Sequence, residues 1–213
     1  MTETFLRNKQ WFFDRWAPSY DCLLTTVFYQ AVHKRLLDYA ELAEQANILD
    51  LGCGTGRLLD RIAKQFPTVT GTGVDLSNEM IHQARSRNLY PQRLSFTTAN
   101  VESLPFAEHQ FDAVFCTISF LHYPHPQQVF AEINRILRPG GCFYLADYQA
   151  NDQTRQTLVP VSPGGLRFYS RVQRAEFGQT VGWYCQGHYH LLGPILLTKF
   201  LKFNGENNTG LRP

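Results

Sequence analysis

The run Ile48-Leu49-Asp50-Leu51-Gly52-Cys53-Gly54-Thr55-Gly56 constrains this chain more than any other stretch. A short apolar segment leads into glycines at alternate positions, and residues 57–64 then have the character of a helix start. Glycine permits sharp turns and lets bare backbone approach a ligand closely. A strand, a glycine turn and a helix N-terminus, in that order, form a nucleotide-binding corner at the carboxyl edge of a parallel sheet. The stretch therefore predicts an α/β fold with a nucleotide site at this corner.

The glycine spacing separates two kinds of nucleotide. Dinucleotide folds use Gly-x-Gly-x-x-Gly/Ala, whereas Arg57 occupies the last small position here. Asp50, at the end of the strand, would repel a pyrophosphate but suits a cation. The pattern resembles the first motif of class I S-adenosylmethionine (SAM) methyltransferases, hydrophobic-Asp-hydrophobic-Gly-x-Gly-x-Gly, and SAM carries an ammonium and a sulfonium. The resemblance implies that the cofactor site includes Asp50, Gly52, Cys53, Gly54 and Gly56. For this motif taken alone, a structural glycine turn in another α/β protein stays an alternative.

The next segments fit the same family. Residues 69–75 predict the second strand, and Asp75 at its tip is placed to accept both ribose hydroxyls. Leu76 follows, where it can lie on an adenine face. Ser77 is a suitable N-cap for a helix over residues 78–86. Met80 can pack beside the adenine or, equally well, in the core.

Residues 94–98 alternate in polarity and predict the third strand. The following Asn100-Val101-Glu102-Ser103-Leu104-Pro105-Phe106 resembles the Asp-Ala-Glu-x-Leu-Pro-Phe segment that frames the adenine in the family. The resemblance implies that Asn100 accepts from the adenine amine, that the next backbone N–H, of Val101, donates to a ring nitrogen, and that Glu102 belongs to the site. Asn100 replaces the usual Asp, and its amide oxygen can still accept. A surface turn is the alternative.

Residues 111–116 predict the fourth strand, and the resemblance implies that a backbone carbonyl at Cys116 holds the SAM ammonium. The Asn/Asp-Pro-Pro-aromatic motif, used by family members that methylate adenine or glutamine amide nitrogens, does not occur here. His122 is predicted near the pocket, where an imidazole can act as a general base at neutral pH. A packing or substrate-orienting role for His122 is the alternative.

The C-terminal part has less specific signals. A helix over residues 127–137 ends at Arg138-Pro139-Gly140-Gly141, and residues 142–148 predict the fifth strand. A loop around residues 160–165 and a helix capped by Ser170 follow. Residues 183–190 and 195–201 predict two last strands that form an antiparallel edge hairpin beside the fifth. His188 and His190 share a strand face, but no acid or cysteine accompanies them, so no metal site is predicted.

The N-terminal part contains a dense aromatic cluster, Trp11 to Asp21, interrupted by Pro18, and then a predicted helix over residues 26–44. The Trp-Ala-Pro-Ser-Tyr-Asp stretch resembles an N-terminal motif of the family. It implies a lid that folds over the cofactor, with Tyr20 facing the sulfonium. A cap that simply packs on the core is the alternative.

Composition narrows the cellular setting. The formal net charge of +2 over 213 residues gives no broad electrostatic reason to bind nucleic acid. The five cysteines are scattered singly, which favours a reducing cytoplasm over a disulfide framework. The first residues mix acids and bases, unlike a signal peptide, and no apolar run is long enough to span a bilayer. We therefore expect a cytoplasmic protein without integral membrane contact.

The combined prediction is a Rossmann-like three-layer α/β/α sandwich. It has a seven-stranded, mostly parallel sheet, the antiparallel edge hairpin and a helical N-terminal cap. We expect one methyltransferase domain over residues 1–213, with the cap at 1–46, the SAM-binding core at 47–148 and the C-terminal helix and edge strands at 149–213. The expected activity is methyl transfer to a small-molecule acceptor, catalysed mainly by proximity and orientation. A SAM-binding protein without transferase activity, a macromolecule methyltransferase and a nicotinamide-dependent oxidoreductase are the alternatives.

Overall fold

The computed structural model describes residues 3–16, 23–154, 156–160 and 165–203. Its main sheet has seven strands in the order β3-β2-β1-β4-β5-β9-β8. The pairs from β3 through β5 are parallel, and β9 pairs antiparallel with both β5 and β8. The predicted fold, with its antiparallel edge hairpin, is confirmed. The strands are β1 (Asn47–Leu51), β2 (Thr70–Asp75), β3 (Leu94–Thr98), β4 (Phe111–Thr117), β5 (Leu137–Tyr148), β8 (Trp183–Leu192) and β9 (Ile195–Lys202).

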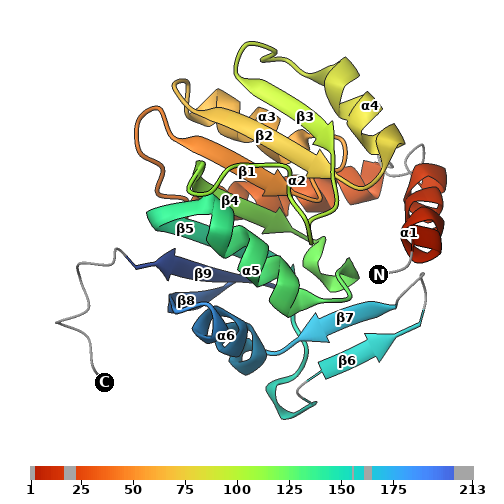
Figure 1. Ribbon diagram of the computed structural model, residues 1–213, viewed down its shortest axis with the longest axis vertical. Coiled ribbons are helices and arrows are strands. Elements are labelled where there is room, and N and C mark those ends of the chain that lie inside the picture. The colour runs from red at the N-terminus through yellow and green to blue at the C-terminus, as the bar shows by residue number, and fades with distance from the viewer. Residues whose placement is uncertain (1–2, 17–22, 155, 161–164, 204–213) are drawn as a thin grey trace.

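Helices cover both faces of the sheet (Figure 1). One apolar cluster joins the sheet to α2 (Leu23–Leu37), α3 (Arg57–Gln65) and α4 (Asn78–Arg87). A second cluster joins the opposite face to α5 (Pro126–Ile136) and α6 (Arg171–Thr180). Parallel strands with right-handed crossovers distribute helices in this way. Since both faces are covered, the carboxyl edge of the sheet is the place left for a site.

Two helix starts follow the predicted capping. The Ser77 hydroxyl accepts from the backbone N–H of Met80 at 3.1 Å, which satisfies a donor in the first turn of α4. Ser170 begins α6 with a capping box, in which its hydroxyl accepts from Gln173 N and the Gln173 side chain accepts from Ser170 N. Local sequence therefore sets these two helix boundaries.

Three segments differ from the prediction. α2 ends at Leu37 rather than near residue 44, and the following backbone is held by the tertiary structure, where the N–H of Glu41 donates to the Tyr144 hydroxyl at 3.0 Å. The Arg138–Gly141 turn lies inside β5, whose pairing with β4 shifts register near Phe111. Two strands that were not predicted, β6 (Gln156–Val159) and β7 (Leu166–Tyr169), pair as a hairpin on either side of the segment predicted as a loop.

The edge strand β3 has side chains on its outer carbonyls. Arg85 donates from Nε and Nη2 to Phe96 O, at 3.0 and 2.7 Å. Asn88 donates from Nδ2 to Leu94 O at 3.0 Å. Both side chains come from the end of α4 or the residue after it, so that helix covers the edge of the strand it precedes. None of the helices in the described ranges is long and apolar enough to cross a membrane.

Candidate functional site

The glycine turn after β1 has the conformation that its sequence predicts. Gly52, Gly54 and Gly56 have φ of 64°, 52° and 80°, a left-handed region that strongly favours glycine. A Cβ on Gly52 would lie 2.5 Å from the Cβ of Ser119, and one on Gly56 would lie 2.8 Å from the Phe96 ring. Conformation and space therefore both require glycine at these two positions.

Asp75, at the end of β2, fixes this turn and keeps capacity for a ligand. Its Oδ2 accepts from Gly54 N and its Oδ1 from Ser77 N, both at 2.9 Å. Each carboxylate oxygen can accept a further hydrogen bond. Burial, opposed by these backbone hydrogen bonds, raises the pKa of Asp75. Leu76 beside it is half-buried, whereas Met80 is 3% exposed and packs inside the fold.

The first helix, α1 (Glu3–Trp16), lies beyond the carboxyl ends of β1 to β3 (Figure 1). Asp14 accepts from the Ser77 hydroxyl and from Glu79 N, at the start of α4. Lys9 donates to the His122 carbonyl in the short helix η2 (Phe120–His122). α1 therefore reaches from the Asp75 corner to the loop after β4. Tyr20, predicted to face the sulfonium, lies outside the described residues.

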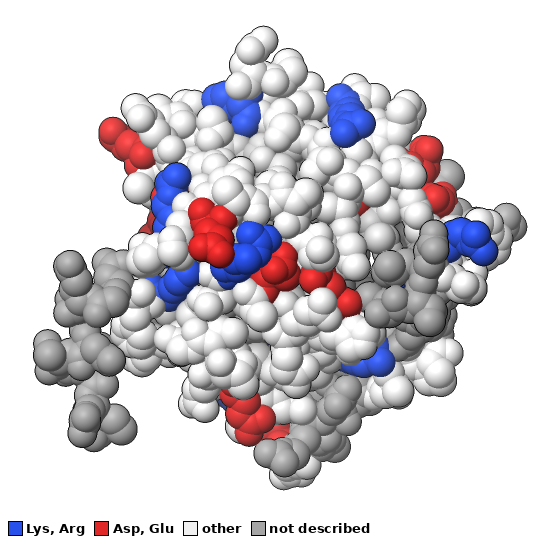
Figure 2. All heavy atoms as spheres, viewed as in Figure 1, with Lys and Arg blue, Asp and Glu red and all other residues white. Residues whose placement is uncertain are grey.

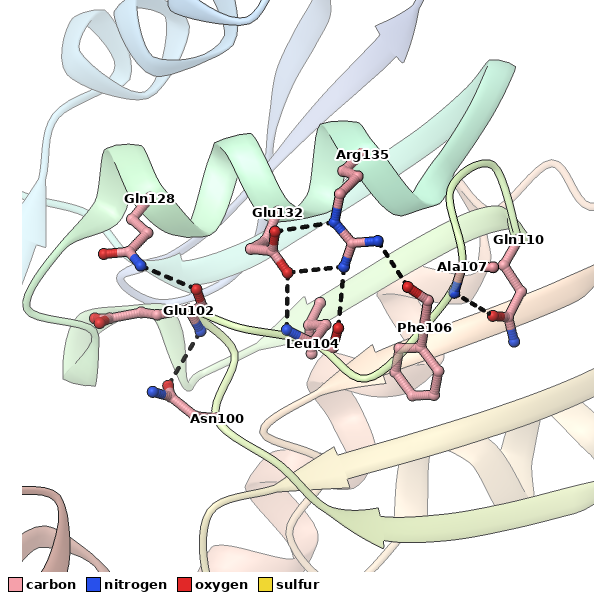
Figure 3. A network of polar contacts seen from close by, with 9 residues as sticks. All are labelled: Asn100, Glu102, Leu104, Phe106, Ala107, Gln110, Gln128, Glu132 and Arg135. Carbon is pink, nitrogen blue, oxygen red and sulfur yellow. Dashed lines mark hydrogen bonds and ion pairs between the residues drawn. The ribbon is translucent and has the colours of Figure 1, made fainter. Parts of the chain in front are cut away.

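The connection after β3 is fastened to α5 by a polar network (Figure 3). Glu132 Oε2 accepts from Leu104 N at 2.8 Å, and Arg135 Nη2 donates to Leu104 O at 3.0 Å. The Asn100 side-chain oxygen accepts from Glu102 N at 3.1 Å, which closes a local turn. An amide oxygen accepts two hydrogen bonds, so Asn100 retains one for the predicted adenine contact.

Glu102 and Val101 are buried at 5% and 8% exposure. The Glu102 carboxylate contacts His125 Nδ1 at 3.1 Å through both oxygens, and its backbone carbonyl accepts from Gln128 at 3.0 Å. Within the described structure, the Glu102 side chain is therefore engaged with the start of α5. Its predicted cofactor role would fall to the backbone of this segment.

The floor of the glycine turn is a buried hydroxyl network. The Ser119 hydroxyl donates to Leu51 O at 2.9 Å, accepts from the Tyr123 hydroxyl at 3.1 Å and contacts Cys116 Sγ at 3.1 Å. Burial raises the pKa of the Cys116 thiol, so that thiol is unreactive at neutral pH. The Cys116 side chain thus supports the turn, and only its backbone is available for the predicted ammonium contact.

His122 has an environment that weakens it as a base. Burial, together with the Lys9 charge, lowers the pKa of His122 to about 4. A general base works best with a pKa near the operating pH. The imidazole is therefore neutral at pH 7 but a poor proton acceptor.

Sequence reasoning missed one side of the site. A cavity of about 50 Å³ beside the glycine turn is lined by Asp50 and Thr117 from the sheet, Tyr29 and His33 from α2, and Arg57 and Arg61 from α3. Arg61 Nη1 lies 3.1 Å from His33 Nδ1 and donates to Arg57 O at 2.9 Å. The two arginines are one helical turn apart directly after the glycine motif, and that spacing was a usable signal. Nothing local in the sequence points to His33.

Asp50 forms the acidic wall of this cavity. It is 2% exposed, and burial together with the Asp75 charge raises the pKa of its carboxyl. No hydrogen bond to the Asp50 side chain occurs within the described ranges. A buried carboxylate with unused acceptors suits a cationic ligand.

Comparison with known proteins agrees with this geometry. The family model for the methyltransferase domain matches residues 48–141. The chain is 36% identical over 175 residues to the malonyl-[acyl-carrier protein] O-methyltransferase of Geobacter sulfurreducens, an alignment that covers 75% of this chain and 63% of that relative. The chain thus spans less than two thirds of that relative's length.

Two solved structures share the fold. One is a chain of the complex between the Haloferax volcanii Trm112 methyltransferase activator and a methyltransferase, with a TM-score of 0.80, 21% identity, and coverage of 90% of this chain and 98% of that one. The other is the Burkholderia thailandensis 1,6-didemethyltoxoflavin-N1-methyltransferase with bound S-adenosylhomocysteine. Its TM-score is 0.68 at 22% identity, with coverage of 82% and 79%. With the glycine turn and the two strand-end acids in place, residues 48–141 match the methyltransferase-domain family, and the chain resembles the class I SAM-dependent methyltransferases.

Proposed function

We propose that this chain transfers the methyl group of SAM to a small-molecule acceptor. The observation that carries the proposal is the pair of acids at the glycine turn, the buried Asp50 on the cavity wall and the partly buried Asp75 at the tip of β2. SAM brings an ammonium, a sulfonium and a ribose diol, which are partners for carboxylates. Asp75 would accept the ribose hydroxyls, Asp50 would face the ammonium, and the glycine turn would admit the backbone close to the ligand.

The adenine would lie against the β3–α5 connection. Asn100 retains one acceptor position, and the Glu102 backbone is held by the Asn100 side chain and by Gln128 of α5 (Figure 3). This rigidity supports the assignment because a preorganised loop loses little entropy on binding. Leu76 and Cys116 complete the proposed cofactor contacts, the first through its side chain and the second through its backbone. Met80 would support Leu76 from the core.

The transfer itself requires little from side chains. The sulfonium already activates the methyl group, so the protein supplies alignment of an in-line attack and exclusion of water. His122, with its lowered pKa, would orient an acceptor rather than deprotonate it. An acceptor that is nucleophilic without a strong base, such as a carboxylate, thiol or amine, fits this site better than an alcohol.

Two observations support a small acceptor. They are the substrates for which similar proteins are named and the distribution of charge on the surface. One relative is named for a malonyl group on an acyl-carrier protein, and one solved structure holds 1,6-didemethyltoxoflavin. Figure 2 shows acidic and basic side chains interspersed on one face, without a broad basic field of the kind that binds nucleic acid.

Calorimetry followed by an activity panel tests the proposal. SAM and S-adenosylhomocysteine should bind, while NAD at the same concentrations should not. Formation of S-adenosylhomocysteine should then depend on a small acceptor such as a malonyl thioester, a phenol or a thiol. Tighter binding of NAD than of SAM would remove the assignment. Turnover only on RNA or on the side chains of a protein would favour a macromolecular acceptor, and SAM binding without turnover on any acceptor would favour a binding protein.

A further inference from the structure

The cavity beside the glycine turn has charges of opposite sign on its walls. Asp50 lies on the sheet side, and Arg57 and Arg61 lie on the α3 side. An α-amino-acid group carries the same two charges in the complementary order. The proposed function sets the ammonium of the cofactor against Asp50, and we infer that Arg61 across the cavity is the ligand of the carboxylate and that His33 positions Arg61. The inference rests on the proposed function, because it presupposes that SAM binds.

Arg61 has hydrogen-bonding capacity that the fold does not use. Its Nη1 is engaged by His33 Nδ1 and Arg57 O, while no described residue accepts from Nε or Nη2. No ion pair joins Arg61 to a carboxylate of the described residues, although the charge of the neighbouring Asp60 acts on it. A guanidinium matches a carboxylate in a bidentate, charge-assisted geometry. A half-buried arginine on a cavity wall, with donors still available, is therefore suited to an incoming carboxylate.

His33 fixes the orientation of this guanidinium. An arginine can only donate, so the 3.1 Å contact requires His33 Nδ1 to be the acceptor and the ring proton to sit on Nε2. Burial and the Arg61 charge lower the pKa of His33 to about 3, which keeps the ring neutral throughout the physiological range. A protonated ring would repel Arg61, so the burial of His33 maintains the contact.

Arg57 is the competing ligand on the same helix. It also lines the cavity, but it is exposed, and its contribution to holding Arg61 is a backbone carbonyl. An exposed arginine is held less firmly and is screened by solvent. The carboxylate should therefore depend on the Arg61 side chain more than on the Arg57 side chain.

This assignment predicts selectivity at one group of the cofactor. Decarboxylated SAM differs from SAM only by the missing carboxylate, and it retains the adenosine, sulfonium and ammonium. Calorimetry on the full chain should show that SAM binds about tenfold to hundredfold more tightly than decarboxylated SAM, the range for a charged hydrogen bond. Arg61→Gln should weaken SAM binding by that factor and leave decarboxylated SAM within about twofold.

Matched variants separate positioning from general damage. His33→Leu removes the acceptor and should reduce the preference for SAM, whereas His33→Asn places an amide oxygen near the Nδ1 position and should restore it. Arg57→Gln, on the cavity wall, should reduce the preference less than Arg61→Gln does, and Lys64→Gln, on the same helix but outside the cavity lining, should keep the wild-type preference. Circular dichroism and thermal melting of each variant confirm that it is folded before binding is compared.

Each result decides the inference. A folded Arg61→Gln variant that still prefers SAM as strongly as the wild type overturns it, as does equal weakening of both ligands. Loss of the preference in Arg57→Gln alone transfers the role to Arg57 and overturns it too. If wild-type protein binds decarboxylated SAM as tightly as SAM, the inference fails while the proposed function stands. If the wild type binds neither ligand, the proposed function itself fails.

Discussion

Two arginines on opposite sides of the sheet show how the same side chain serves the fold and the site. Arg174 in α6 is 1% exposed and donates to three backbone carbonyls, Leu196 O at 2.8 Å, Asp147 O at 3.0 Å and Tyr148 O at 2.7 Å. Arg61 in α3 is half-buried, and its hydrogen bonds to the described residues use Nη1 alone. Arg174 thus ties three segments together, whereas Arg61 lines a cavity. Arg174 also has a buried Nε without a hydrogen-bond partner in the described structure, so access to a cavity is what separates the two side chains.

Their surroundings differ in the same way. Arg174 borders an aromatic core in which Phe130 contacts Phe143, Phe177, Trp183 and Phe200 at centroid distances of 5.5 to 5.6 Å. Close-packed rings of this kind transmit any change in volume to their neighbours. The Arg61 cavity is instead lined by glycines and polar groups. Substitutions should therefore affect stability on one side and binding on the other.

The largest expected effect is on stability. Arg174→Met should lower the free energy of unfolding by about 3–5 kcal/mol, because it leaves buried carbonyls and Asp147 without their cationic partner. Arg61→Met should lower it by less than about 1 kcal/mol, as is usual for a partly exposed residue. Urea denaturation of both variants measures the difference, and equal losses would remove the distinction between the two arginines.

The buried carboxyl of Asp147, near Arg174, should make the stability of the fold depend on pH. Burial raises the pKa of Asp147 to about 6, although Arg174 lowers it. The folded state then holds the proton more tightly than the unfolded state, whose pKa is near 3.8. Stability should therefore fall as pH rises from about 4 to about 6, by up to about 3 kcal/mol from this group. Denaturation of wild type and Asp147→Asn across this range should give curves that diverge toward neutral pH, and parallel curves would contradict the assignment.

Asp75→Ala tests the binding side. It should weaken SAM binding by about 2–3 kcal/mol, the range for losing hydrogen bonds to a charged group. Calorimetry measures this directly, with Asp75→Asn as the variant that keeps an acceptor oxygen. A folded Asp75→Ala protein with an unchanged dissociation constant would show that Asp75 only fixes the glycine turn.

The smallest expected effect concerns the N-terminal cap. Because Asp14 and Lys9 connect α1 to opposite ends of the proposed cofactor site, residues 8–24 should become more protected from hydrogen exchange when cofactor binds. β1 should be protected with or without cofactor. Tyr20→Ala should weaken SAM binding and change the melting temperature of the cofactor-free protein little. Equal protection of residues 8–24 in both states would make the cap a fixed part of the core.

The sequence predicts those parts of the fold that depend on residues close together in the chain. β1, β3 and the starts of α4 and α6 follow from apolar runs and serine caps. The β6–β7 hairpin was missed because each strand has only four residues, the segment between them is rich in proline and glycine, and the strands depend on pairing with each other. α2 was drawn too long because the backbone after Leu37 is held by β5, a partner about a hundred residues away.

The site residues likewise fall into those that local motifs predict and those that depend on tertiary contacts. Asp50, the glycines and Asp75 come from motifs with fixed spacing, so their clustering follows from strand order alone. The role of His33 could not be predicted from the sequence, because His33 contacts Arg61 only when α2 packs on α3. Its function as a hydrogen-bond acceptor depends on that contact. The predicted role of Glu102 was drawn from the same motif, but the partner of its side chain, His125, lies on another element.

The cover on β3 decides how copies of this protein can meet. An open sheet ends in strands whose free carbonyls and N–H groups recruit strands from other molecules, and this is a common route to aggregation. Arg85 and Asn88 occupy the outward carbonyls of Phe96 and Leu94, so another strand would have to displace a charged side chain before it could extend the sheet there. The residues that end α4 should therefore oppose the addition of a strand at β3, which is a task separate from the chemistry at the carboxyl edge.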